Sequence, residues 1–324
     1  LEKNQQTLIS NKNIKETKHF IPAFSIGDRT RSFFKIQDGC DYFCSFCTIP
    51  LARGKSRNSS ISETIKEAKK IAKTEVKEIV LTGVNIGDFG QGGQENFFGL
   101  IKELDKLRGI DRFRISSIEP NLLTNDIISF CLTESELFVP HFHIPLQVGN
   151  NRLLKAMRRK YDRELYAERV QTIKSLNPSA CIGVDVIVGF PGETDDDFMD
   201  TINFIKDLDV SYLHVFTYSE RARTTAIKLE GSVPIHVRRN RSKQLHILSE
   251  KKKRAFYEKN TNTVVSVLFE NENNNGVMYG FSENYIKVKT PFSPELANTI
   301  QKVELETIDS DGIMNCLITE RSIL

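Results

Sequence analysis

The chain has 324 residues, 39% hydrophobic and 27% charged, an ordinary composition for a globular protein, and its length suggests about two domains. No window approaches ~18 consecutive apolar residues, so the sequence predicts no membrane-spanning helix. Six cysteines, three clustered and three scattered, do not resemble a secreted disulfide scaffold, which favours a reducing cytoplasmic location.

Charge is distributed unevenly along the chain. Residues 263–324 hold four Lys and Arg against nine Asp and Glu, a net charge of −5. The remainder, with 41 basic and 33 acidic residues, is net +8. A basic body of this kind favours a polyanionic partner.

The first 30 residues are polar and begin with Leu1 rather than methionine. They lack the apolar core of a signal peptide. We interpret residues 1–30 as a linker at the cut end of a longer protein.

Residues 31–260 alternate short apolar runs with amphipathic segments, which predicts parallel strands with crossover helices. Capping boxes at Ser60/Glu63 and Thr194/Asp197 precede predicted helices over Ile61–Lys73 and Phe198–Leu208. The predicted strands are Phe33–Gln37, Glu78–Thr82, Arg112–Ser117, His141–Ile144, Cys181–Val188 and Tyr212–Thr217. Six such units predict an α/β fold, a partial (β/α)6 barrel with reactive groups at the carboxyl ends of its strands.

Residues 261–324 form a second predicted domain, a small closed β-barrel. Short β-branched and aromatic runs alternate there with turns such as Asn275-Gly276 and Asp311-Gly312. The predicted strands are Val264–Phe269, Val277–Phe281, Tyr285–Lys289, Lys302–Ile308 and Ile313–Ile318. Barrels of this kind often bind nucleic acids.

Three cysteines in the run CDYFCSFC, Cys40, Cys44 and Cys47, directly follow the first predicted barrel strand. Thiolates suit iron–sulfur clusters or zinc, and a closed zinc site needs a fourth ligand. Three thiolates on a cubane cluster leave one iron open, the arrangement that binds and cleaves S-adenosylmethionine. The alternative is a zinc knuckle completed by Asp38 or a distant histidine.

Polar residues follow other predicted strands and are candidates for cofactor binding. The turn after Gly183–Val188 contains Gly189, Gly192 and Glu193, and its backbone suits the adenine and ribose of S-adenosylmethionine, although such turns also serve packing alone. Glu119 and Gln147 suit the amino and ribose groups, with strand-end capping as the alternative. We interpret His143 as a satisfied rim histidine rather than a ligand.

Basic residues cluster after the cysteines and along a predicted helix, Val237–Tyr257. Arg53, Lys55 and Arg57 lie where a polyanionic substrate would enter, so we expect them to contact RNA phosphates. This helix also has an apolar side, and its basic residues are equally well explained as a solvent-exposed face without an RNA contact.

Together these segments resemble one family, the radical S-adenosylmethionine methylthiotransferases. The resemblance runs from about Ser32 to the C-terminus and is strongest to members that act on threonylcarbamoyladenosine in tRNA. It is based on the segments IQDGCDYFCSFCTIPLARGKSR, LTGVNIGDFG, RISSIEPN, HFHIPLQVGNNRLLKAMRRKY, GVDVIVGFPGETDDDF and TYSERARTTAIKLEGSVP.

The resemblance implies that Cys40, Cys44 and Cys47 ligate a 4Fe–4S cluster whose fourth iron is chelated by S-adenosylmethionine. It implies methylthiolation at carbon 2 of the adenine beside the anticodon, with a reducing electron donor. The terminal barrel resembles the family's tRNA-binding TRAM domain, although its acidic charge argues against a simple electrostatic role and leaves local contacts through Lys287 and Lys289.

The chain departs from the family because no cysteine precedes Cys40. The family's N-terminal domain, which holds a second, sulfur-donating cluster, is therefore expected to be absent. The alternatives are a sister enzyme, acting on isopentenyladenosine in tRNA or on a ribosomal-protein aspartate, and a non-catalytic RNA-binding protein with a structural metal.

Overall fold

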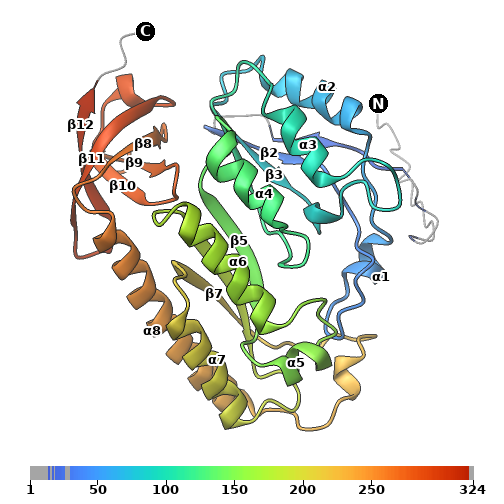
Figure 1. The fold of residues 1–324 in the computed structure, drawn as a ribbon. Helices are drawn as coiled ribbons and strands as arrows, with labels where there is room; N and C mark the ends of the chain where they lie inside the picture. The colour runs from blue at the N-terminus through green and yellow to red at the C-terminus, as the bar shows by residue number, and fades with distance from the viewer. Residues whose placement is uncertain (1–13, 15–16, 18, 26–29, 321–324) are drawn as a thin grey trace, which may run out of the picture.

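Parallel strands in two sheets form the centre of the larger part of the molecule (Figure 1). The computed structural model describes residues 14, 17, 19–25 and 30–320, so most of the predicted linker lies outside the described residues. The first sheet contains β1 (Ala23–Phe24), β2 (Arg31–Lys35), β3 (Glu78–Thr82) and β4 (Arg112–Ile115). The second contains β5 (His141–Gln147), β6 (Cys181–Val188) and β7 (Tyr212–Thr217). Strand β1 pairs antiparallel with β2, so part of the predicted linker joins the sheet.

Two isolated parallel bridges, Phe113 to Phe138 and Ser117 to His143, connect the sheets. Strands β2 to β7 therefore form an open, six-stranded partial barrel, which confirms the predicted fold class. Strand β5 continues to Gln147, three residues beyond its predicted end, because the whole strand is buried.

Helices cover the outside of these strands, and the sequence signals explain where two of them begin. Both predicted capping boxes form, at Ser60 and at Thr194. The second helix starts at Asp195 rather than Phe198, because three aspartates in its first turn favour the positive end of the helix dipole. The helices are α1 (Ile49–Arg53), α2 (Ile61–Ile71), α3 (Phe97–Leu104), α4 (Asn125–Ser129), α5 (Asn151–Ala156), α6 (Arg163–Leu176), α7 (Asp195–Asp207) and α8 (Ile235–Lys259). Among the described residues, no helix combines the length and apolarity that a membrane crossing requires.

The C-terminal segment forms a closed five-stranded barrel, as predicted, in the order β10-β12-β11-β8-β9. Tyr285, predicted to begin a strand, instead occupies a turn with a φ of 65°, and the strand starts at Lys287. The strands are β8 (Val264–Phe269), β9 (Val277–Ser282), β10 (Lys287–Pro291), β11 (Ile300–Ile308) and β12 (Met314–Glu320). This barrel has a separate hydrophobic core that includes Val267, Met278 and Val303.

Buried arginines of β4 connect the two parts of the molecule. Arg114 donates to both carboxylate oxygens of Glu78, at 2.9 and 3.1 Å, and also to the carbonyl oxygen of Glu283 at 3.2 Å. Arg112 donates to the carbonyl oxygen of Ser266 at 2.7 Å. Burial opposes ionisation of Glu78, but Arg114, together with the neighbouring arginines, outweighs it and lowers the pKa of that carboxyl. The C-terminal barrel is thus held against the amino end of β4.

We expect Glu78→Gln to destabilise the protein by about 3–5 kcal/mol, because it leaves buried arginines without a counter-charge. Urea unfolding at neutral pH measures the change. The matched control is Glu103→Gln, which removes an exposed ion pair with Lys106 and should cost less than about 1 kcal/mol. Equal effects of the two substitutions would contradict the role of Glu78.

Candidate active site

The cysteine loop runs from the end of β2 to α1, at the carboxyl edge of the first sheet (Figure 1). Gly39 begins this loop with a φ of 72°, and a Cβ there would fall 2.0 Å from the carbonyl oxygen of Lys55. Only glycine fits this position, so the turn that presents the cysteines depends on it.

Each cysteine sulfur accepts one hydrogen bond from the surrounding protein. The backbone nitrogens of Tyr42 and Ile49 donate to Cys40 and Cys47, at 3.3 and 3.4 Å. The Nη1 of Arg159 donates to Cys44 at 3.2 Å. Hydrogen bonds of this kind orient thiolate ligands and adjust the potential of an iron–sulfur cluster.

The thiols of Cys40 and Cys44 are poorly suited to ionise by themselves. Burial raises the pKa of Cys40 to about 12 and also raises the pKa of Cys44. A bound metal ion reverses this preference, because a coordinating thiol loses its proton. The chemistry of the three sulfurs therefore fits a positively charged metal centre.

A chamber of about 310 Å³ opens beside the cysteines, within the usual size range for small-ligand sites. Glu119 and Gln147 both line it, and their predicted contact with the cofactor stays a prediction. Burial raises the pKa of Glu119 despite its ion pair with Arg159. Gln147 has a φ of 70°, a strained conformation typical of functional positions. The lining also includes Tyr42, Asn85, Ser117, Pro145, Arg159 and Asp185.

Asp38 is not available as the fourth ligand of a zinc knuckle. Its carboxylate accepts from Arg57 at 2.9 Å and from the backbone nitrogen of Gly39 at 2.9 Å. His143, the histidine singled out in the sequence, does not line the chamber of the cysteines and is grouped with Asp185 and His214. The structure thus gives no support to the zinc alternative.

The glycine turn after β6 is bonded to α8 through Glu193 and Arg241. Its residues do not line the chamber. Glu193 accepts from the backbone nitrogen of Gly189 and from Arg241, both at 2.6 Å. The backbone nitrogen of Gly192 donates to the carbonyl oxygen of Gly231 at 2.8 Å. The assignment of Gly189, Gly192 and Glu193 to cofactor binding stays a prediction, and each residue has a packing role.

Sequence reasoning missed several chamber residues, among them Arg159 and Asn85. Arg159 belongs to a basic run, yet its side chain is only 5% exposed and contacts both Cys44 and Glu119. Asn85 has a buried Oδ1 with no hydrogen-bond partner among the described residues. Such an unpaired buried oxygen is expected where a bound ligand supplies the hydrogen-bond donor. Asn85 follows the predicted strand Glu78–Thr82, which marks its segment as part of the rim, whereas Arg159 has no local sequence signal that separates it from a surface residue.

Comparison with known proteins agrees with this geometry. A model of the radical SAM superfamily matches residues 34–205. The chain belongs to the radical SAM superfamily. This superfamily uses a 4Fe–4S cluster with S-adenosylmethionine, and Cys40, Cys44 and Cys47 are the residues that would hold the cluster.

Two relatives carry the name threonylcarbamoyladenosine tRNA methylthiotransferase MtaB. The Bacillus subtilis protein is 40% identical over 88% of this chain and 64% of its own length. The Aquifex aeolicus protein is 37% identical over 89% of this chain and 68% of its own length. The chain thus spans about two thirds of these relatives. A Clostridium tetani relative, named tRNA-2-methylthio-N(6)-dimethylallyladenosine synthase, is 36% identical over 76% of this chain and 54% of its own length.

Solved structures of radical SAM enzymes share the fold. The methyltransferase TsrM of Kitasatospora setae, with cobalamin and a [4Fe-4S] cluster bound, has a TM-score of 0.52 at 15% identity, over 60% of this chain and 35% of that one. The coproporphyrinogen III oxidase HemN of Escherichia coli has a TM-score of 0.50 at 16% identity, over 70% of this chain and 53% of that one.

Cys44→Ala should abolish cluster binding, because two thiolates do not hold the cluster stably. Iron analysis and the visible spectrum after anaerobic reconstitution measure this loss. The control is Cys131→Ala, a buried cysteine outside the chamber, which should retain roughly four irons. Full iron content in Cys44→Ala would overturn the assignment.

Arg159→Gln should lower the reduction potential of the cluster, because it removes a positive donor from the Cys44 sulfur. Potentiometric titration followed by electron paramagnetic resonance measures the shift. Arg158→Gln removes the same charge from the exposed neighbouring position and should leave the potential unchanged. An equal shift in both variants would show that the hydrogen bond is unimportant.

Proposed function

We propose that the chain is the catalytic part of an enzyme that methylthiolates carbon 2 of threonylcarbamoyladenosine beside the anticodon of tRNA. The observation that carries the proposal is the cysteine triplet, with one donor to each sulfur, beside a ligand-sized chamber. The names of the relatives from Bacillus subtilis and Aquifex aeolicus support the substrate. When bound, the cluster and S-adenosylmethionine supply the radical chemistry.

A sister reaction on isopentenyladenosine in tRNA is the second candidate, and the Clostridium tetani relative favours it. Either reaction takes place in the cytoplasm and needs a reducing electron donor. In both, the target base leaves its stack to reach the chamber.

The three residues predicted to contact RNA differ in how far their side chains are exposed to solvent. Lys55 is exposed, and the side chain of Arg53 is 54% exposed beside Asp38. Arg57 is only 12% exposed and donates to Asp38 and to the carbonyl oxygen of Arg53. We therefore propose Arg53 and Lys55 as phosphate contacts and assign Arg57 to the support of the cysteine loop.

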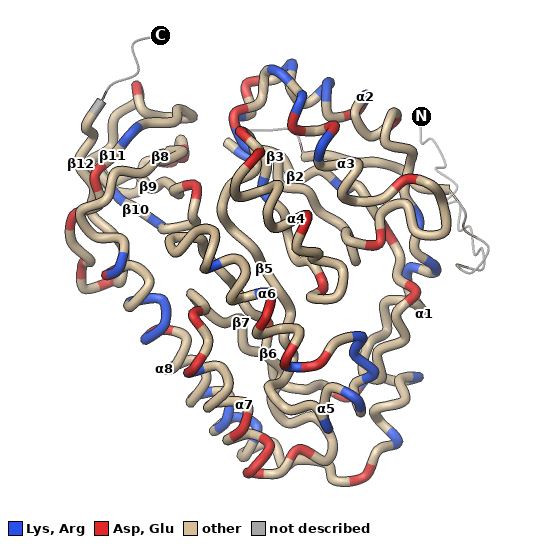
Figure 2. The backbone as a smooth tube through the Cα atoms, in the orientation of Figure 1, with Lys and Arg blue, Asp and Glu red and all other residues tan. Residues whose placement is uncertain are grey.

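Basic residues also run along α8, as Figure 2 shows, but they do not form one solvated face. Arg238 and Arg241 are buried. Arg238 donates to the carbonyl oxygen of Tyr218 at 2.9 Å, and Arg241 donates to the carboxylate of Glu193 at 2.6 Å. Exposed cations such as Lys243 and Lys251 remain on the outer side. They provide a second surface for the phosphate backbone.

Replacing Arg53 and Lys55 together with alanine should weaken tRNA binding and reduce the salt slope by about 1 for each phosphate that is no longer neutralised. Filter binding across a salt series measures both quantities. Lys66→Ala with Lys69→Ala removes the same charge from exposed positions on α2 and is the control. Equal effects of the two pairs would contradict a local role for Arg53 and Lys55.

The function itself is tested by mass spectrometry of tRNA nucleosides from a strain that lacks the gene. Loss of 2-methylthio-threonylcarbamoyladenosine supports the proposal, whereas loss of the isopentenyl counterpart supports the sister reaction. The full-length gene should restore the missing nucleoside, and the same gene with Cys44→Ala should not. Unchanged tRNA would overturn both candidates.

The 324-residue chain alone should cleave S-adenosylmethionine but leave tRNA without a methylthio group. Its other cysteines, Cys131, Cys181 and Cys316, are buried in different elements and cannot ligate a second, sulfur-donating cluster together. With dithionite, chromatography should detect 5′-deoxyadenosine and no modified nucleoside. Detection of the methylthiolated product would require a sulfur source other than a second cluster on these cysteines.

A further inference from the structure

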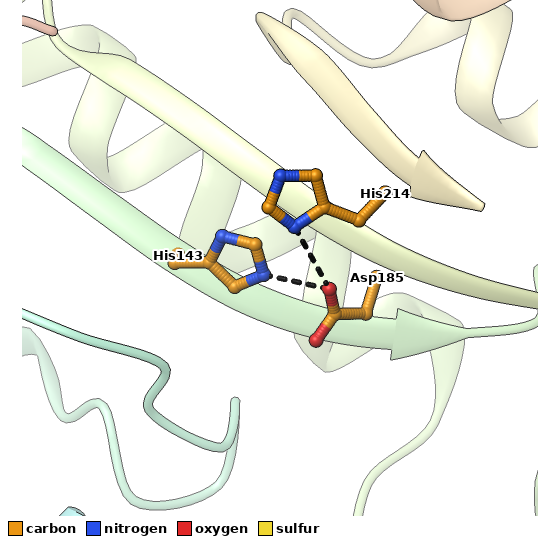
Figure 3. Close-up of side chains that lie close together, drawn as sticks. All are labelled: His143, Asp185 and His214. Atoms are coloured by element: carbon orange, nitrogen blue, oxygen red, sulfur yellow. Dashed lines mark hydrogen bonds and ion pairs between the residues drawn. The ribbon is translucent and has the colours of Figure 1, made fainter. Parts of the chain in front are cut away.

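Three side chains in the interior of the partial barrel converge on one point, as Figure 3 shows. His143 lies on β5, Asp185 on β6 and His214 on β7. The Nε2 of His143 is 2.8 Å from Asp185 Oδ1, and the Nδ1 of His214 is 3.4 Å from the same oxygen. Among the described residues, this is the one cluster of histidine, cysteine and carboxylate groups whose potential ligand atoms all lie within 4.8 Å of one another.

The strand register explains why these side chains meet. Asp185 is paired directly with His214 on the next parallel strand, so their side chains leave the sheet on the same face. His143 is paired with Gly183, two residues before Asp185 and thus on that same face. A Cβ at Gly183 would fall 2.8 Å from Nδ1 of His143 and 2.4 Å from the ring of Tyr212, so glycine leaves room for both rings.

We propose that His143, Asp185 and His214 bind one divalent transition-metal ion of the zinc type. Two imidazoles and one carboxylate form a recurring ligand set for such ions, with further positions left open. This revises the interpretation of His143 as a satisfied rim residue. The inference is independent of the proposed function, because it depends only on these side chains.

The surroundings of the cluster have the features of a supported metal site. Tyr212 contacts His143 Nδ1 at 3.5 Å and His141 Nε2 at 3.1 Å, so its hydroxyl bridges the two rings. Ligating histidines usually have such a partner on the second nitrogen, which fixes the orientation of the ring. His141 is itself fixed by stacking on Tyr285, with ring centroids 4.4 Å apart.

The carboxylate is ready to serve as a ligand. Asp185 Oδ1 lies 2.8 Å from a ring nitrogen of His143 and 3.4 Å from one of His214, so a single oxygen faces both imidazoles. In the absence of a metal these two rings are the polar partners of the Asp185 carboxylate. A cation bound among the three groups would take the place of these contacts, with the carboxylate oxygen and the two ring nitrogens as its ligands.

Access to the site comes from two sides. Asp185 lines the chamber that contains the cysteines, and His214 lines a cleft of about 290 Å³ next to the C-terminal barrel. The side chain of His214 is 54% exposed, so an ion can enter without opening the fold. The open positions of the ion are then available to water or to an oxygen or nitrogen atom of a bound molecule.

The test uses untagged protein in two forms, the reconstituted holoenzyme and a variant with Cys40, Cys44 and Cys47 changed to alanine. The second form removes thiolates that would otherwise bind zinc. Equilibrium dialysis against micromolar Zn²⁺, followed by metal analysis, should give one zinc per chain in both forms, with the cluster iron of the holoenzyme retained. X-ray absorption should show imidazole and oxygen ligands at about 2.0–2.1 Å and no sulfur.

His214→Gln and Asp185→Asn should each weaken zinc binding about tenfold or more, because each removes one ligand. His246→Gln, at an exposed position on α8, is the control and should bind zinc like the parent protein. Zinc should raise the melting temperature of the parent and of the control but not of the ligand variants.

Three results would overturn the proposal: no bound zinc at micromolar concentration, unchanged affinity in His214→Gln, or zinc binding to the holoenzyme only with loss of iron. If a ligand variant fails to fold, the stoichiometry and the absorption spectrum of the parent forms decide the question. The variant without Cys40, Cys44 and Cys47 has no sulfur ligands at the triplet, so a zinc spectrum without imidazole there would also refute the site.

Discussion

The shared direction of the six strands β2 to β7 is the constraint on which the other features depend. Because the strands are parallel, their carboxyl ends meet at one edge, and residues distant in the sequence reach one chamber. The cysteine loop follows β2, Asn85 follows β3, Glu119 follows β4 and Gln147 ends β5. A cluster held at this edge is therefore surrounded by side chains from several strands without any long insertion.

Buried arginines hold this arrangement together. Arg114 pairs with Glu78 beneath the C-terminal barrel, Arg159 with Glu119 in the chamber, and Arg241 with Glu193 behind the glycine turn. Removing such charges from water is costly, so each pair requires close geometry and further hydrogen bonds. The basic balance of residues 31–260 consequently overstates the positive surface available to RNA, because some of these cations serve the interior.

The C-terminal barrel packs at the amino ends of the strands, opposite the cysteine loop. His141 stacks on Tyr285 with ring centroids 4.4 Å apart, and Asn284 donates to the carbonyl oxygen of Ser179 at 2.9 Å. The histidine–aspartate cluster lies between this contact and the chamber. Strands β5 and β6 thus run from the contact with the C-terminal barrel to the chamber.

The sequence by itself determined most of the strands, the capping boxes and the cysteine triplet, but it missed β1 and the turn at Tyr285. Each feature that it determined depends on periodicity or spacing over a few residues, and the same local contacts persist in the fold. Only the tertiary structure decided the partners of the buried charges. Arg159 and Cys44 are 115 residues apart, and His143, Asp185 and His214 come from three strands. Their meeting depends on strand register and on burial, which a local pattern does not specify. The glycine turn shows the same limit, because its packing against α8 depends on where that helix crosses the sheet.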